Sequence, residues 1–198
     1  ADVIVDFAHV PPGNHVLRNL GPDEPFGGGE PDVDFPLPDP DTTGQVMQFR
    51  VSASTAPDPS TPAEFLALPA IAPLPPETRV RRLALLEHMH SLGEGGPTAA
   101  LLGSVDADPA DGPAGTTHLM WMDPVTENPS LGDTEVWEVY NLTADAHPVH
   151  IHEVAFEVVD RQPITVVDGY VDLDPDSPRT PPLPGETGRK DTVIAYPE

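Results

Sequence analysis

Three histidines stand within six residues of one another, at His147, His150 and His152. Imidazole is a ligand that suits copper and zinc. In an extended chain, alternate side chains point to opposite faces, so His150 and His152 should project together while His147 points elsewhere. The spacing predicts metal binding in which one short strand serves two separate centres. The alternative interpretation is a cluster of surface histidines without a metal.

The elements that must position these histidines are predicted to be strands. Proline occurs 28 times and glycine 16 times, and this composition disfavours helices along almost the whole chain. Apolar runs predict strands at residues 3–7, 46–51 and 79–87, and residues 63–66 favour one helical turn. Residues 52–78 have the Pro, Ala, Ser and Thr composition of an interdomain linker.

Further segments on both sides of the histidines belong to the same sequence pattern as the histidines themselves. They are residues 121–129, 133–141, 154–161 and 188–193. With the His-Pro-x-His-x-His core, they resemble the third cupredoxin domain of bacterial multicopper oxidases, in the group of spore-coat laccase, bilirubin oxidase and phenoxazinone synthase. Residues 1–7 and 46–51 resemble the closing strands of that family's second domain, so the resemblance covers nearly the whole chain.

The resemblance implies an all-β fold, a cupredoxin-like Greek-key β-sandwich or barrel whose C-terminal strands are missing. Residues 1–51 would be the closing strands of a preceding cupredoxin domain, and residues 52–78 a Pro-rich linker. Residues 79–198 would form the C-terminal cupredoxin domain, truncated before its cysteine-containing copper segment.

The resemblance also implies copper as the cofactor and a role for each histidine. His147 would ligate the type 1 copper, His150 the type 2 copper and His152 one of the type 3 pair. A blue-copper site needs a cysteine thiolate, and the chain contains no cysteine. In the family, a His-Cys-His segment and two His-x-His pairs of a first domain supply the other ligands. We therefore expect the chain alone to be inactive, with a companion polypeptide supplying them.

The function implied is that of a laccase-like oxidoreductase. It would couple one-electron oxidation of phenolic, aromatic amine, bilirubin-like or metal-ion reductants to the reduction of dioxygen to water. An extracytoplasmic location is expected: secreted, periplasmic, or at the spore or cell surface. Two alternatives stay open: a non-catalytic copper- or zinc-binding or assembly module that keeps the three histidines as one site, and a degenerate domain with a structural role.

The charge of the chain excludes two classes of partner. Acidic residues outnumber basic ones 33 to 9, which gives a formal net charge of −24. Nucleic acids and anionic membranes require clusters of Lys and Arg, so neither is expected as a partner. No apolar stretch of about 18 residues predicts a transmembrane helix.

Other residues are predicted to have structural roles. His88 and His90 repeat the His-x-His spacing but are interpreted as strand-end histidines, and His118 has no partner at a metal-ligand spacing. Trp121 and Trp137 are interpreted first as core aromatics.

Three further motifs have competing interpretations. The acidic loop with Asp106, Asp108 and Asp111 resembles a calcium loop, but a solvated loop is favoured. Residues 141–143 match a glycosylation sequon for which a structural role is favoured. Glu153 either orients a metal-bound imidazole or points away from it.

Overall fold

The computed structural model describes residues 3–67, 69–90, 95–105 and 113–197. The chain divides into two compact units, Ala1–Ile71 and Ala72–Glu198, and the boundary between them falls within residues 52–78. The fold is all-β: the described residues form strands and three turns of 3-10 helix, η1 to η3, but no α-helix. None of these helical turns could cross a membrane.

The first unit contains one antiparallel pair of strands. β1 (Gly13–Arg18) pairs with β2 (Gln45–Val51), so that Gly13 lies opposite Val51. β2 confirms the strand expected at residues 46–51, and η1 (Ala63–Phe65) confirms the helical turn.

The strand expected at residues 3–7 is wrong, because the described part of this segment forms no strand. Val3 and Ile4 are 78% and 66% exposed, and no neighbouring strand supplies the hydrogen-bonding ladder that extended residues need. Phe7 makes the segment's aromatic contact, with its ring centroid 5.1 Å from that of Phe49. An apolar run without a partner strand therefore stays irregular.

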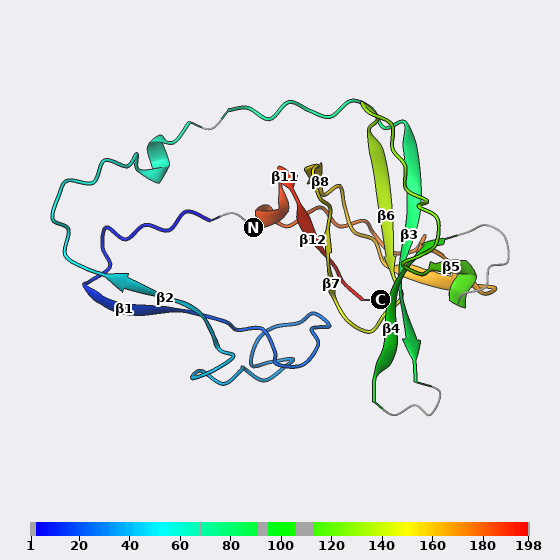
Figure 1. Ribbon diagram of the computed structural model, residues 1–198, viewed down its shortest axis with the longest axis horizontal. Helices are drawn as coiled ribbons and strands as arrows, with labels where there is room; N and C mark the ends of the chain where they lie inside the picture. The colour runs from blue at the N-terminus through cyan, green and yellow to red at the C-terminus, as the bar shows by residue number, and fades with distance from the viewer. Residues whose placement is uncertain (1–2, 68, 91–94, 106–112, 198) are drawn as a thin grey trace. The chain divides into compact units, whose positions relative to one another are not determined.

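The second unit is built on a four-stranded sheet in the order β5-β4-β3-β6 (Figure 1). Its strands are β3 (Arg79–Met89), β4 (Pro97–Val105), β5 (Thr116–Leu119) and β6 (Glu135–Asn141). β3 runs parallel to β6 and antiparallel to β4, and it confirms the strand expected at residues 79–87. Ala84, Leu86 and Tyr140 are buried, so the core lies on β3 and β6.

Three smaller antiparallel pairs complete this unit. They are β7 (His147–His150) with β12 (Thr192–Ala195), β8 (Phe156–Glu157) with β11 (Arg189–Lys190), and β9 (Ile164–Val167) with β10 (Tyr170–Leu173). The remaining helical turns are η2 (Pro113–Gly115) and η3 (Pro184–Glu186). In Figure 1, β7 and β12 run side by side, so the histidine-bearing strand is paired with a strand from the end of the chain.

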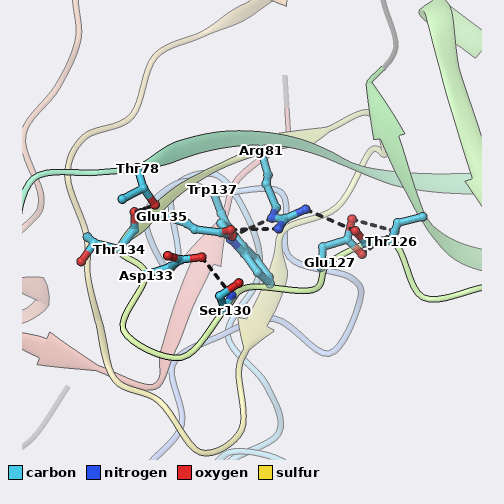
Figure 2. Close-up of polar contacts among 9 residues, drawn as sticks. All are labelled: Thr78, Arg81, Thr126, Glu127, Ser130, Asp133, Thr134, Glu135 and Trp137. Carbon is cyan, nitrogen blue, oxygen red and sulfur yellow. Dashed lines mark hydrogen bonds and ion pairs between the residues drawn. The ribbon is translucent and has the colours of Figure 1, made fainter.

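A buried ion pair fixes the start of β6 against β3 (Figure 2). Arg81 donates to both carboxylate oxygens of Glu135, from Nε at 2.6 Å and from Nη2 at 2.8 Å. Its Nη1 donates to the carbonyl of Thr126 at 3.2 Å, and the Trp137 indole N–H donates to Glu135 at 2.9 Å. The hydrogen bonds from Arg81 hold the pKa of Glu135 at about 2. The network therefore also secures the loop that precedes β6.

The expectation of a core position is wrong for Trp121, which is 96% exposed. It lies in a tight turn in which the Asp123 N–H donates to the carbonyl of Met120 and the Asp123 carboxylate accepts from the Met120 N–H. This turn directs the indole away from the described residues of its unit. Trp137, in contrast, is half-buried on β6.

Candidate metal centre

Pairing between β7 and β12 places the three histidines. His147 begins β7 opposite Ala195, and His150 ends it opposite Thr192. His152 follows two residues later, outside the strand, and is exposed like His150. The ladder therefore fixes the backbone of His147 and His150, while His152 depends on the chain directly after the strand.

The orientation of the His150 ring is set by its contact with β12. Its Nδ1 lies 2.7 Å from the carbonyl oxygen of Asp191 and 3.1 Å from the hydroxyl of Thr192. A carbonyl oxygen can only accept, so Nδ1 must carry the hydrogen and Nε2 keeps its lone pair for a metal. The same Asp191 carbonyl accepts the Ile151 N–H at 3.2 Å. One backbone oxygen thus holds both the ring and the chain beside it.

The structure brings His150 and His152 together. Their ring centroids are 4.9 Å apart in an edge-to-face arrangement. His147 is half-buried and has a different neighbour, because its Nε2 lies 2.6 Å from the Thr143 hydroxyl. Across the described ranges, no group of three or more metal-ligating side chains is gathered at one point.

These residues fit copper by their chemistry but do not complete a site. Imidazole nitrogen is a good copper ligand, and a hydrogen bond from the second ring nitrogen to a carbonyl is the usual support for a metal-bound histidine. His150 has that support from Asp191. His150 and His152 lie together and His147 has a different neighbour. Each centre therefore needs further ligands from elsewhere.

Two further histidines, His88 and His118, lie away from this strand in sequence and make a pair of their own. His88, exposed on β3, has its ring centroid 5.0 Å from that of His118 on β5, edge to face. Sequence spacing could not reveal this pair, because it arises in the sheet, where β4 lies between β3 and β5. His90 lies just beyond β3, which agrees with its interpretation as a strand-end residue.

Two of the weaker motifs now have a structural description. Asn141 is only 4% exposed and its side chain is hydrogen-bonded inside the unit, as expected for a structural role. Glu153 is exposed, adopts a positive φ of 67°, and makes no hydrogen bond or ion pair with His152 among the described residues. The acidic residues Asp106, Asp108 and Asp111 lie outside the described residues.

The all-β fold, in which His147 and His150 lie on a paired strand, agrees with a cupredoxin-like protein. A family model described as multicopper oxidase matches residues 97–198. The laccase of Bacillus subtilis (strain 168) is 31% identical over 199 residues, which cover 98% of this chain and 33% of that laccase. Multicopper oxidase LPR1 homolog 5 of Oryza sativa subsp. japonica is 33% identical over 175 residues, covering 85% of this chain and 23% of that protein.

A laccase of Haloferax volcanii is also similar, at 42% identity over 69 residues, which cover 35% of this chain and 10% of that protein. The chain belongs to the multicopper oxidase family and is laccase-like in sequence. It spans about a third of the length of the Bacillus laccases that it matches.

Proposed function

We propose that this chain supplies three of the copper ligands of a laccase-like multicopper oxidase. His147 ligates the type 1 copper, His150 the type 2 copper and His152 one of the type 3 pair. The complete protein oxidises phenolic, aromatic amine, bilirubin-like or metal-ion reductants by one electron at a time and passes the electrons to dioxygen. Bound copper supplies this redox chemistry.

The separation of the histidines is the observation that carries the proposal. His150 and His152 have adjacent rings, whereas the Nε2 of His147 is engaged by Thr143. A single site shared by all three, as in a simple copper or zinc module, has no support in the described residues, because they contain no such group. Two centres, served by β7 and by the chain directly after it, match the division between type 1 and trinuclear copper.

The protein's own contribution is to hold the imidazoles. Asp191 keeps the hydrogen of His150 on Nδ1, which leaves Nε2 for the metal. The β7–β12 ladder fixes the distance between His147 and His150 along the strand. Such preorganisation would hold the imidazole nitrogens in place for copper, which would supply the redox chemistry.

We propose that a companion polypeptide supplies the remaining ligands, and exposed apolar side chains support a covered surface on this chain. Met122, Val125 and Leu131 are exposed, as is Trp121, and all four belong to the segment between β5 and β6. Exposed apolar side chains this close in sequence support a surface that another part of the protein covers. We propose an extracytoplasmic location for the assembled oxidase, on the basis of its family resemblance.

Copper content and visible absorption of the complete oxidase test the assignment. We expect His147→Gln to lose the intense blue colour while copper bound at the trinuclear cluster is retained. His150→Gln and His152→Gln should lose cluster copper and oxygen reduction while the blue colour persists. The matched control is His88→Gln, which alters an exposed histidine of β3 and should change neither property.

The proposal fails if His147→Gln protein stays blue. It also fails if all three variants lose colour and copper in equal proportion, since that result would indicate one shared centre.

A further inference from the structure

The Thr143 hydroxyl lies at the centre of a buried polar network beside His147. Thr143 is 7% exposed and Asn141 4% exposed, so water does not readily replace the bonds between them. The hydroxyl oxygen is 2.6 Å from His147 Nε2, the shortest hydrogen bond that this threonine makes. Neither Thr143 nor Asn141 is a metal ligand in the proposed function, yet this network holds both of them close to the proposed ligand His147.

Asn141 can take only one orientation in this network. Its Nδ2 group donates to the carbonyl of Asp145 at 2.8 Å and to that of Ala195 at 3.1 Å. Carbonyl oxygens accept only, so the nitrogen must face them and Oδ1 must face Thr143. Oδ1 accepts the Thr143 backbone N–H at 3.1 Å and lies 2.8 Å from the Thr143 hydroxyl oxygen.

The hydroxyl of Thr143 has one hydrogen to donate and two lone pairs. If it donated to His147, its oxygen would face Asn141 Oδ1 at 2.8 Å and the Asp145 carbonyl at 3.1 Å without a hydrogen between either pair. If it donates to Asn141, or to the Asp145 carbonyl instead, its two lone pairs accept the Asp145 N–H at 3.3 Å and the ring N–H of His147 at 2.6 Å. The second arrangement satisfies every hydrogen-bond donor and acceptor of the network. It leaves only one close pair of oxygens without a hydrogen between them.

We propose that Thr143, oriented by Asn141, is a positioning residue that fixes the His147 ring with its hydrogen on Nε2 and so leaves Nδ1 as the nitrogen that binds metal. The metal-binding part of this inference rests on the proposed function, whereas the position of the hydrogen does not. His150 is held by Asp191 in the opposite tautomer, with Nε2 left for metal. The two histidines of one strand thus present different ring nitrogens, as two separate centres require.

Nuclear magnetic resonance of the metal-free full chain tests the position of the hydrogen. Long-range ¹H–¹⁵N correlation of the histidine rings, at about pH 8 where an ordinary imidazole is neutral, distinguishes the two tautomers. The His147 signals are assigned by their loss in His147→Gln. We expect the wild-type chain to carry the hydrogen on Nε2 of His147 and on Nδ1 of His150.

Variants of Thr143 separate positioning from a purely structural role. Thr143→Val keeps the volume but removes the hydroxyl, and we expect a mixture of His147 tautomers. Thr143→Ser restores the hydroxyl and should restore the single tautomer. The control is Thr98→Val, which removes a threonine hydroxyl that donates to the carbonyl of His88 at 2.9 Å and should leave His147 unchanged.

In the copper-loaded oxidase, Thr143→Val should weaken copper binding at the centre of His147 by about 10- to 100-fold, with Thr143→Ser close to wild type. Hydrogen on Nδ1 of wild-type His147 would overturn the inference even if Thr143→Val failed to fold. An unchanged tautomer in folded Thr143→Val would overturn it as well. If the hydrogen is on Nε2 but His147→Gln protein stays blue, the type 1 assignment fails while the role of Thr143 in setting the tautomer stands.

Discussion

At the scale of single residues, Glu135 makes the stability of the second unit depend on pH. Its pKa is lowered from 4.5 to about 2 by the hydrogen bonds from Arg81, so the folded state favours the ionised carboxylate. The contribution of this carboxylate to the free energy of unfolding is fully present above pH 4.5, the pKa of the group in the unfolded chain. It is lost as the pH falls from there through about 2. Burial of both partners makes the loss of one of them costly.

We therefore expect Glu135→Gln to lower the midpoint of urea unfolding at pH 7. The difference from wild type should shrink steadily between pH 4.5 and pH 2, where the wild-type carboxylate takes up its proton. Glu77→Gln changes an exposed glutamate and should leave the midpoint unchanged. A difference between Glu135→Gln and wild type that stayed constant from pH 7 to pH 2 would show that the ion pair is not its source.

The three histidines could be singled out from the sequence as candidate metal ligands because their spacing alone is unusual. The sequence did not indicate Asp191 or Thr143 as the residues that orient them. Asp191 reaches His150 through the pairing of β12 with β7, which a local pattern cannot show. In the sequence, Thr143 was only the last residue of an Asn-x-Thr pattern. Its role follows from the turn that places its hydroxyl beside His147.

At the scale of elements, the contact between β4 and β5 depends on Gly103. A Cβ built on this residue would overlap the carbonyl oxygen of Thr117 and lie 2.9 Å from Cδ1 of Leu86. Backbone atoms of β5 cannot move aside as a flexible side chain could. The two strands can approach this closely only because position 103 has no side chain.

We expect Gly103→Ala to destabilise the sheet by about 1–3 kcal/mol, as overpacking of a well-packed interior does. Leu102→Ala is the control: it changes more atoms, at the preceding position of β4, but Leu102 is 66% exposed and the change in stability should be within about 0.5 kcal/mol. Urea unfolding of both variants measures the difference. An equal effect of the two substitutions would contradict close approach as the role of Gly103.

Strand prediction succeeded where an apolar run also has a partner strand. Residues 79–87 form β3, which lies between β4 and β6. The apolar residues at 3–7 have no such neighbour in their unit. β1 was missed because its polar residues Asn14 and His15 follow two prolines and break the apolar pattern, whereas its pairing with β2 is a tertiary event.

At the scale of the whole molecule, charge is the dominant feature. The formal net charge of −24 means that acidic groups repel one another in the compact state. The screening length falls from about 10 Å at 0.1 M salt to about 3 Å at 1 M. We expect the thermal unfolding midpoint at pH 7 to rise when sodium chloride is increased over this range.

The same salt series near pH 4.3, the isoelectric point of the chain, provides the control. The net charge is close to zero there, so added salt should raise the midpoint far less. An equal rise at both pH values would indicate that salt acts by exclusion from the protein surface, without a contribution from charge repulsion.

The hydrogen bond between His150 and the Asp191 carbonyl joins residues 41 positions apart in the chain. A contact of this length requires the intervening chain to be closed into a loop, which costs conformational entropy. Until β12 docks on β7, the Asp191 carbonyl and the Thr192 hydroxyl cannot fix which ring nitrogen of His150 carries the hydrogen. In the unpaired chain the imidazole can therefore carry its hydrogen on either nitrogen, and docking of β12 selects one tautomer. The tautomer of His150 is thus a tertiary property of the second unit, set only when β12 has paired with β7.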